Sequence, residues 1–295
     1  MGKLLKSLLV IIITLVIIVA LAVGGLWAFC YFKYDVNVFS VASALNKISQ
    51  TPEETAQVAD YESLMTKLND ALCVGGNKVI TKDAEDNYKM DYDQANKPLT
   101  SDLELTDAEC CALFNLVLPE KLNVGGSEIK FSDYDFKLLQ LHFADRFEVT
   151  TSEETRINNS FRVISSISLI DVKKKMNTFP LSLLKGKVPD TLVIDSTVTI
   201  SMKKNTIEYT VDSKALNLNR VKHEELKPVF KLINNFIKIG EVDAFNKQIG
   251  SLFVNGLLGT SESAGFGYSL VNTSHVATSF EFIDSGDAVK YVIHV

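Results

Sequence analysis

The feature that most constrains this chain is an uninterrupted apolar run near its start. Residues Leu8–Phe32 include no charged side chain, and Thr14 is the only polar residue among them. A helix of that length reaches about 37 Å, whereas the hydrocarbon core of a bilayer is roughly 30 Å thick. Transfer of Leu, Ile, Val and Phe side chains into lipid is favourable, and no charge within the run opposes it. The run therefore predicts one N-terminal transmembrane helix, with the lipid bilayer as a partner of the chain.

The charges beside the run predict its orientation. Lys3 and Lys6 precede it together with the amino terminus, whereas Lys33 follows it close to Asp35. Lysines near a span favour the cytoplasmic side of the membrane. We therefore expect a cytoplasmic N-terminus, an extracytoplasmic C-terminal body and a single-pass location in the cell membrane.

A cleaved signal peptide is the alternative to an anchor. Ala20-Leu21-Ala22 has the small-x-small spacing that a signal peptidase needs. Cleavage there would leave Val23–Phe32 as an apolar new terminus, and the whole run exceeds the roughly 7–15 residues of a usual signal core. We favour the uncleaved signal-anchor, and both alternatives place the body outside the cytoplasm.

The run divides the chain into three parts. Residues 1–33 are the expected cytoplasmic stub and anchor, 34–50 a juxtamembrane segment, and 51–295 an extracytoplasmic domain, with a further boundary near 180–190 as an alternative. Beyond residue 33 the chain keeps 27 of its 30 basic side chains and all 36 acidic ones. An acidic body does not suit a phosphate backbone, so nucleic acid is not an expected partner.

Helix starts are marked by two capping boxes. Thr51-Pro52-Glu53-Glu54 and Thr106-Asp107-Ala108-Glu109 each place a capping threonine three residues before a glutamate. In such a box the two side chains satisfy each other's free backbone N–H groups. The first box predicts a helix that continues to Leu72 with Val58 on its apolar face. The second predicts a helix that Pro119 ends.

Alternating apolar and polar residues predict strands. Leu192–Met202 form one long strand whose apolar face is interrupted by Ser196, and residues 207–211 return beside it. Residues 280–295 form a C-terminal hairpin around Asp284-Ser285-Gly286-Asp287. Alternation of this kind is typical of antiparallel sheet with one solvated face.

Two further amphipathic helices are predicted between these strands, one from Phe230 to near Gly240 and one from Phe245 to Gly259. The predicted fold class is therefore α+β: a transmembrane helix followed by a body rich in antiparallel sheet with amphipathic helices. An elongated curved sheet that wraps a helix, loosely like lipid-carrying modules, is the alternative arrangement, and it rests on fold-level analogy.

Three cysteines lie beyond the apolar run, at Cys73, Cys110 and Cys111. That number is too small for a disulfide scaffold. Buried free thiols are the favoured interpretation. The alternative is one bridge from Cys73 to either Cys110 or Cys111, since neighbouring residues of a helix point in different directions.

The four histidines, His142, His223, His275 and His294, are spread along the chain without zinc-site spacing. His142 lies in an apolar stretch, which favours a buried core imidazole. His223 opens a charged helix start at His223-Glu224-Glu225. Neither pattern indicates catalysis.

Two weaker signals for chemistry occur in the sequence. Ser182-Leu183-Leu184-Lys185 matches the S-x-x-K motif, but the partner motifs S-D-N and K-T-G are absent. Acidic clusters could in principle hold Ca²⁺, but none fits a calcium loop, so solvated turns are the favoured interpretation. These clusters are Asp83, Glu85, Asp86, Asp91 and Asp93, and Asp133 with Asp135. The sequence therefore predicts no catalytic, cofactor-binding or metal-binding residue, and no cofactor.

The favoured function is that of a membrane-anchored extracytoplasmic binding or assembly protein without enzymatic activity. Its partner would be an apolar ligand such as lipid, or a protein of the cell envelope. The apolar stripes meet either in a closed core, which is favoured, or around an open groove. The alternatives are a cell-envelope hydrolase or transferase with an unrecognised site, and a structural partner of other membrane proteins through Gly24-Gly25.

Overall fold

The computed structural model describes residues 37–50, 56–72, 75–91, 98–117, 121–124, 127–130, 135–175, 186, 188–203, 208–234, 241–259, 265–272 and 277–295. The apolar run Leu8–Phe32 lies outside these residues. Within the described residues, no helix combines the length and the apolar composition that a membrane span requires. The transmembrane helix therefore stays a prediction from the sequence.

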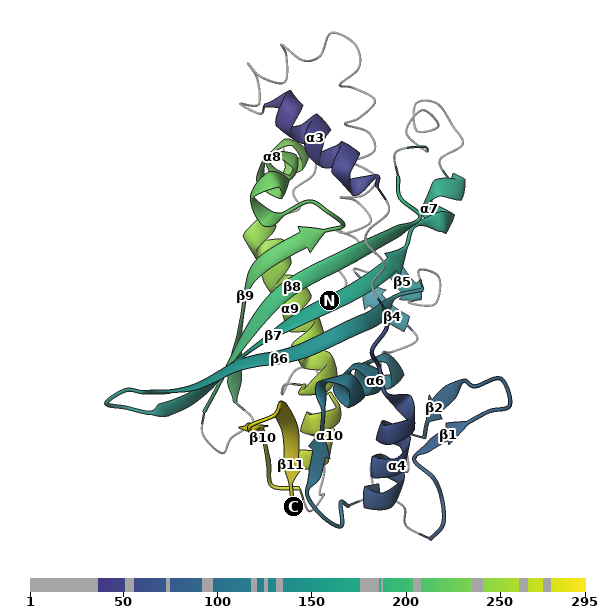
Figure 1. The fold of residues 1–295 in the computed structure, drawn as a ribbon, viewed down its shortest axis with the longest axis vertical. Coiled ribbons are helices and arrows are strands. Elements are labelled where there is room, and N and C mark those ends of the chain that lie inside the picture. The colour runs from purple at the N-terminus through teal and green to yellow at the C-terminus, as the bar shows by residue number, and fades with distance from the viewer. Residues whose placement is uncertain are drawn as a thin grey trace.

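The body is an α+β fold built on antiparallel sheets, as predicted. Its central sheet has four strands in chain order, each antiparallel to the next (Figure 1). They are β6 (Lys137–Thr150), β7 (Thr155–Ser168), β8 (Thr191–Lys203) and β9 (Tyr209–Leu218). The predicted long strand and its returning partner correspond to β8 and β9. The sequence analysis assigned no strand to β6 or β7, although each has 14 residues.

Three smaller sheets complete the strand content of the described residues. The predicted C-terminal hairpin is confirmed as β10 (Ser279–Asp284) and β11 (Val289–His294), and β3 (Leu103–Leu105) pairs with the free side of β11. The other two are hairpins formed by β1 (Ile80–Lys82) with β2 (Tyr88–Met90), and by β4 (Lys121–Val124) with β5 (Ser127–Lys130).

The described helices surround these sheets. They are α3 (Val38–Ile48), α4 (Tyr61–Leu72), α6 (Asp107–Val117), α7 (Ile170–Lys175), α8 (His223–Asn234), α9 (Val242–Leu257) and α10 (Phe266–Asn272). Helix α9 confirms the second helix predicted after the long sheet. Helix α8 confirms the first from Phe230 to Asn234 and already begins at His223, and residues 235–240 lie outside the described residues. Helix α9 ends before Gly259, whose φ of 75° lies in the left-handed region that glycine adopts without strain.

The second capping box forms as predicted. The Thr106 backbone N–H donates to Glu109 Oε2 over 2.8 Å, and the Glu109 N–H donates to Thr106 Oγ1 over 3.3 Å. The side chain of Glu109 thereby satisfies the backbone N–H of Thr106, and the side chain of Thr106 satisfies the backbone N–H of Glu109 at the start of α6.

The helix predicted from Thr51 through Leu72 is wrong in its first part. Residues 56–60 are not helical, and α4 begins at Tyr61, where Asp60 Oδ1 accepts a hydrogen bond from Ser63 N over 3.0 Å. The Val58 N–H instead donates to Leu139 O of β6 over 3.0 Å. A tertiary contact with the sheet therefore overrides the local helix signal, and Thr51–Thr55 lie outside the described residues.

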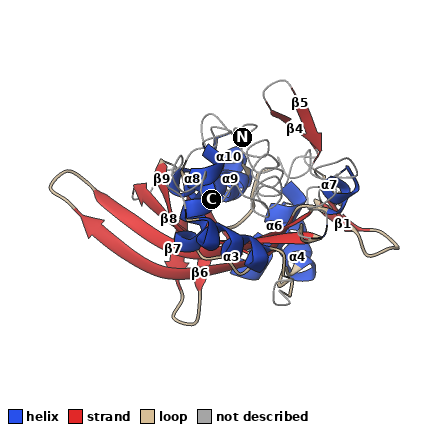
Figure 2. Cartoon of the chain, turned by 90° about the horizontal axis from the view of Figure 1, so that it is seen from above, coloured by secondary structure: helices blue, strands red, loops and turns tan. Residues whose placement is uncertain are grey.

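The central sheet curves around α9, which packs along β8 and β9 on the inner side of the arc (Figure 2). Apolar side chains of α9 are buried there and belong to one continuous hydrophobic cluster with the inner faces of the strands. They are Val242, Phe245, Ile249, Phe253, Val254 and Leu257. The apolar stripes of the sequence thus meet in a shared core.

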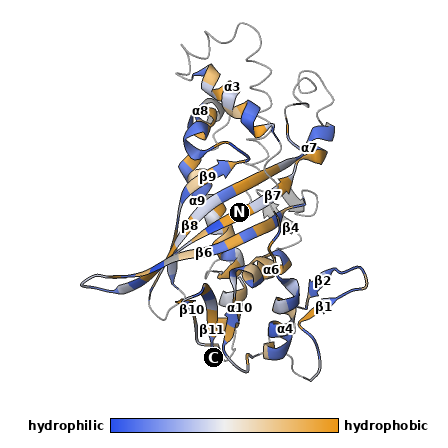
Figure 3. Cartoon of the chain, in the orientation of Figure 1, coloured by the Kyte–Doolittle hydropathy of each residue, from blue (hydrophilic) through white to orange (hydrophobic). Residues whose placement is uncertain are grey.

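The two faces of the sheet differ as the alternation predicted. On β8, every second residue from Leu192 to Met202 is buried on the inner face, including Ser196, and the intervening residues mostly reach the outer face. Hydrophobic and hydrophilic residues both occur along the strands of this sheet (Figure 3). Arg162 of β7 and Asp195 of β8 form an ion pair on that outer face. The outer face is therefore the solvated one.

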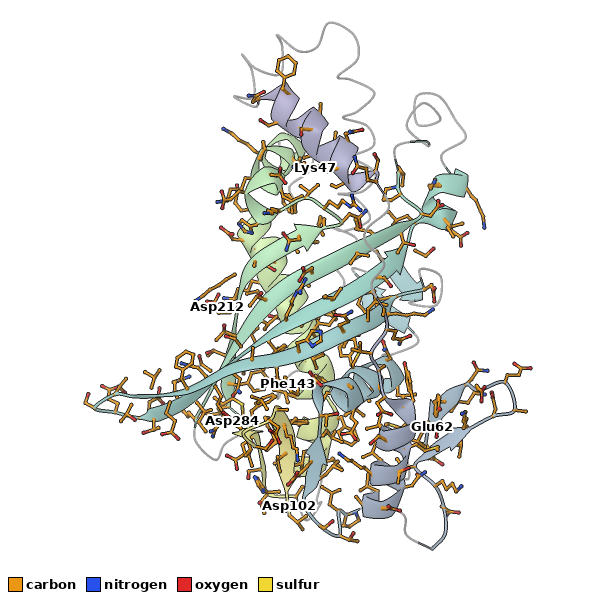
Figure 4. The ribbon with its side chains drawn as sticks, in the orientation of Figure 1. Lys47, Glu62, Asp102, Phe143, Asp212 and Asp284 are labelled. Atoms are coloured by element: carbon orange, nitrogen blue, oxygen red, sulfur yellow. The ribbon has the colours of Figure 1, made fainter. Side chains whose placement is uncertain are left out.

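Helix α3 packs against α8 at one end of the long axis, and the C-terminal sheet lies at the other end, so Lys47 and Asp102 mark opposite ends of the body (Figure 4). Lys47 forms an ion pair with Glu225 of α8. Asn219 Nδ2 also donates to Ile48 O over 2.7 Å. Residues 37–50, which belong to the predicted juxtamembrane segment, are therefore bonded to the folded body.

Candidate functional site

The inner face of the sheet is organised in rows, because paired residues of antiparallel neighbours point to the same side. One row runs from Phe143 on β6 through Phe161 and Val198 to Ser213 on β9. The rings of Phe143 and Phe161 meet edge to face with their centroids 5.9 Å apart. Most members of the inner rows are apolar and buried, so each polar side chain among them needs a physical reason.

Three buried serines cross this face diagonally, with Ser165 on β7, Ser196 on β8 and Ser213 on β9. Asn246 of α9 is buried above them, and Ser196 Oγ donates to its Oδ1 over 2.5 Å. A Cβ added at Gly250 of α9 would lie 1.8 Å from Ser213 Oγ. The helix is therefore held against β8 and β9 by close contact and one buried hydrogen bond.

The other half of the inner face, on β6 and β7, contains a different polar pair. The pairing of β6 with β7 shifts register between Ala144 and Arg146, so that Arg146 lies opposite Asn159 on the inner face. A register shift of this kind reverses which residues of a strand face inward. It turns Phe147 outward, where that ring is exposed, and it places a guanidinium beside a buried amide.

Neither member of this pair is satisfied. Asn159 is 1% exposed, and both its Oδ1 and its Nδ2 lack a hydrogen-bond partner within the described residues. Arg146 is partly buried, and its Nε is likewise buried without a partner there. A buried amide without a hydrogen bond lowers stability by about 1–3 kcal/mol. Among the described residues of the inner face and α9, Ser165 Oγ, Ser213 Oγ and Asn246 Nδ2 are also buried without a hydrogen-bond partner.

Arg162 shows how an arginine on the same sheet is satisfied. Its Nε and Nη2 donate to the two carboxylate oxygens of Asp195 over 2.9 and 2.7 Å, and this pairing raises the pKa of Arg162. The described residues supply no such carboxylate to Arg146 Nε. An acceptor that carries negative charge would suit the Nε–H of Arg146, which has none among the described residues.

The three histidines that the structure describes lie on three different elements, β6, α8 and β11. His142 is on β6 with its side chain 46% exposed, so the predicted core imidazole is wrong; its Nε2 bonds to Gln140 Oε1 over 2.9 Å. His223 starts α8 as predicted and pairs with Asp243 at the start of α9 over 2.8 Å. His275 lies outside the described residues.

His294 is held between two carboxylates. Its Nδ1 lies 2.8 Å from Asp102 Oδ2 and its Nε2 lies 2.9 Å from Glu281 Oε1. Burial acts to lower the pKa of His294, but the hydrogen bonds to both carboxylates outweigh it, so the pKa is raised. Since both ring nitrogens are occupied, His294 ties β11 to its neighbours and is not available as a base.

Of the remaining sequence signals, the acidic cluster at Asp83 is partly described and forms a turn. Asp83 Oδ1 accepts hydrogen bonds from the N–H groups of Glu85 and Asn87 over 2.9 and 3.0 Å, which confirms a solvated turn between β1 and β2. Across the described parts of the chain, no His, Cys, Asp and Glu side chains gather in a group suited to a metal ion. The S-x-x-K segment Ser182–Lys185 lies outside those parts, as do Asp93 and Asp133.

Cys110 and Cys111 are buried free thiols in α6. Burial raises the pKa of the Cys110 thiol well above its ordinary value and that of Cys111 to about 12. Both thiols are therefore protonated at physiological pH and poorly reactive. Cys73, the other half of the alternative bridge, lies outside the described residues.

Sequence reasoning missed Arg146 and Asn159. The chain has four arginines, and three of them, Arg146, Arg156 and Arg162, lie within 17 residues of one another. That clustering was the available signal. It could not identify the pair, because Arg146 reaches the inner face only through the register shift.

The comparisons with known proteins give no family. No family model matches the chain, and neither the curated proteins nor the solved structures include a match to it. The functional conclusion therefore depends on the residues and geometry described above.

Proposed function

We propose that this chain is a membrane-anchored extracytoplasmic binding or assembly protein whose body works at the membrane face on an amphiphilic or apolar envelope component. The observation that carries the proposal is the uncharged apolar run Leu8–Phe32 placed directly before a folded body. Such a run favours stable insertion, and the flanking lysines favour a cytoplasmic N-terminus.

The short connection to the body supports this placement. Helix α3 begins at Val38, so only Lys33–Asn37 separate it from the run. Five residues reach at most about 18 Å even when fully extended. If the run spans the membrane, the end of the body that carries α3 would lie close to the bilayer, and Phe39, which is 71% exposed, would suit that interface.

The curved sheet supports the kind of partner. Its inner face is largely apolar, and on the half that β6 and β7 form, Arg146 Nε and the Asn159 amide are buried without a hydrogen-bond partner among the described residues. An apolar surface with a few polar groups is the usual composition of a site for an amphiphile.

Site-directed cysteine labelling of intact cells tests the topology. Glu153→Cys adds a thiol at the exposed turn between β6 and β7, and Lys3→Cys adds one before the apolar run. We expect a membrane-impermeant maleimide to label the E153C protein in intact cells and the K3C protein only after permeabilisation. The unsubstituted chain provides the background. Labelling in the opposite order, or recovery of the full-length chain in the soluble fraction, would refute the proposal.

A further inference from the structure

Strand β6 lies at one edge of the central sheet, and its second half is exposed. It pairs with β7 on one side, and no strand of the described residues pairs with its other side. Helix α6 packs against the start of β6, where the Asn115 side chain binds both the N–H and the C=O of Leu138. Residues Phe147–Thr150 are exposed, and the β6–β7 hairpin projects beyond the helices of the body (Figure 1). An exposed sheet edge is a template on which another strand can pair.

Two apolar side chains lie on the outer face of this exposed part. Phe147 is 49% exposed and Val149 is 40% exposed. Their register partners on β7, Asn158 and Arg156, are polar. A half-exposed phenyl ring beside an open edge loses contact with water if a further strand joins that edge, and this burial is favourable.

The hairpin turn shows which backbone groups point to the open edge. Thr151 N donates to Glu154 O over 2.9 Å, so these two residues form a hydrogen-bonded pair. Hydrogen-bonded and non-hydrogen-bonded pairs alternate along an antiparallel ladder. Counted back through the register, Phe147 directs its N–H and C=O towards β7, whereas Arg146 and Glu148 direct theirs away from β7.

A second copy of β6 fits this edge in the antiparallel direction. A two-fold axis at Phe147 places Arg146 of each copy opposite Glu148 of the other, so outward-pointing backbone groups meet and both contacts join opposite charges. An axis at Arg146 or at Glu148 would set like charges opposite each other, and an axis at Val149 would pair neither charge with its opposite. Charge complementarity therefore selects the axis at Phe147.

The same register covers the exposed ring. Phe147 lies opposite its own copy in a non-hydrogen-bonded pair, where the side chains of an antiparallel sheet are closest. It also supplies a carboxylate to Arg146, whose Nε has no acceptor among the described residues.

We propose that the exposed part of β6 is an interface between two copies of this chain, which joins their central sheets through a two-fold axis at Phe147. The interface is independent of the ligand class and of the membrane topology proposed above.

Disulfide crosslinking of the full-length chain in a neutral detergent tests the register. Every variant carries Cys30→Ser and Cys73→Ser, so the buried Cys110 and Cys111 are the only native thiols. Phe147→Cys places two thiols across the axis, where the Cα atoms are about 4.5 Å apart and within the range of a disulfide. We expect oxidation to convert most F147C chains into a covalent dimer.

Val149→Cys is the matched control. Val149 is exposed on the same face, but it lies two residues from the axis, so the two copies of this residue are about 13 Å apart along the strands. A disulfide needs Cα atoms within about 7 Å, so V149C chains should crosslink at least about tenfold more slowly than F147C chains.

Charge reversal tests the contact between Arg146 and Glu148 in the F147C chain. Arg146→Glu alone, or Glu148→Arg alone, sets like charges opposite each other at both symmetry-related contacts, so each should slow crosslinking about tenfold or more. A mixture of the R146E and E148R chains restores opposite charges at both contacts and should recover the dimer. Circular dichroism of each variant checks that the fold is kept.

Each of three outcomes would overturn the inference. Crosslinking of V149C as fast as that of F147C would exclude the register, and folded R146E and E148R chains whose mixture forms no dimer would exclude the charge pairing. F147C chains that sediment as monomers and do not crosslink would exclude the interface, and this result decides the matter even where a charge variant fails to fold. A cytoplasmic body in the labelling experiment would refute the membrane topology without altering any of these results.

Discussion

Glu109 caps α6 and also accepts hydrogen bonds from α4, so removal of its carboxylate tests how much these contacts stabilise the fold. The side chain of Glu109 is only 2% exposed. Its oxygens accept hydrogen bonds from Thr106 N over 2.8 Å, from Lys67 Nζ over 2.8 Å and from Ser63 Oγ over 2.5 Å. Glu109→Ala removes all three bonds at once and leaves the donors on α4 without their acceptor.

The expected loss follows from these contacts. An N-cap interaction contributes about 1 kcal/mol, and a hydrogen bond to a charged group about 1.5–3 kcal/mol. Lys67 is 37% exposed, so water can solvate its ammonium group once the carboxylate is gone. We therefore expect Glu109→Ala to lower the free energy of unfolding by about 2–4 kcal/mol at pH 7, the sum of the cap and the charged hydrogen bond.

Glu104→Ala is the matched control. Glu104 also forms an ion pair with a lysine, Lys290, at 2.9 Å, but its side chain is 55% exposed. Solvent screens such a pair, so its loss should cost less than about 1 kcal/mol. Urea unfolding followed by far-ultraviolet circular dichroism suits both variants, because the single tryptophan, Trp27, lies in the apolar run. An equal loss in the two variants would refute the reasoning.

The same contact predicts a pH dependence. Burial acts to raise the pKa of Glu109, but the hydrogen bonds from Lys67, Ser63 and the Thr106 N–H outweigh it, and the pKa lies below its ordinary value of 4.5. A lowered pKa in the folded state stabilises the fold above pH 4.5, and that stabilisation is lost as the pH falls through the folded-state value. The difference in the free energy of unfolding between wild type and E109A should therefore shrink as the pH falls from 5 to 3. A difference that stays constant over this range would contradict the prediction.

Three further predictions concern the core. Gly250→Ala should lower the free energy of unfolding by about 1–3 kcal/mol, because the added methyl group overpacks against Ser213. Ser213→Ala in the same chain should restore most of that free energy. Additive effects of the two substitutions in a double-mutant cycle would count against the contact between Gly250 and Ser213. Asn159→Leu should raise the free energy of unfolding by about 1–3 kcal/mol in the absence of ligand, measured by urea unfolding, and a loss would show that the amide is satisfied. Cys110 and Cys111 should react with a maleimide at pH 8 only after denaturation, as mass spectrometry of the labelled peptides would show; rapid labelling of the folded chain would contradict their burial.

The strands that follow simple alternation were predictable, and those that do not were missed. From Leu192 to Met202, inward-facing and outward-facing residues alternate along β8 without interruption, so the sequence pattern shows which residues lie on each face. In β6 the register shifts twice, at Leu138/Gln140 and at Ala144/Arg146, and each shift changes which alternate residues face inward. Each shift interrupts the alternation that marks a strand, and β7 adds Asn159 and Ser165 to its inner face.

A helix-start pattern predicted the structure correctly where its hydrogen bonds join residues close together in the chain. The Thr106–Glu109 box joins residues three apart, and the structure contains both of its bonds. The helix predicted from Thr51 fails in residues 56–60, because Val58 bonds to Leu139, which is 81 positions further along the chain. His142 fails for a related reason, since its apolar neighbours along β6 do not reveal which face its side chain takes.

By itself the sequence determined the α+β class, the C-terminal hairpin and the β8–β9 pair. It also predicts an anchor at Leu8–Phe32. Each of these depends on composition or spacing within a short stretch of the chain. Tertiary structure alone decided that α3 packs on α8, that α9 lies against β8 and β9, and that Arg146 meets Asn159. These contacts join residues distant in the chain, and a single register shift determines which side chains share a face.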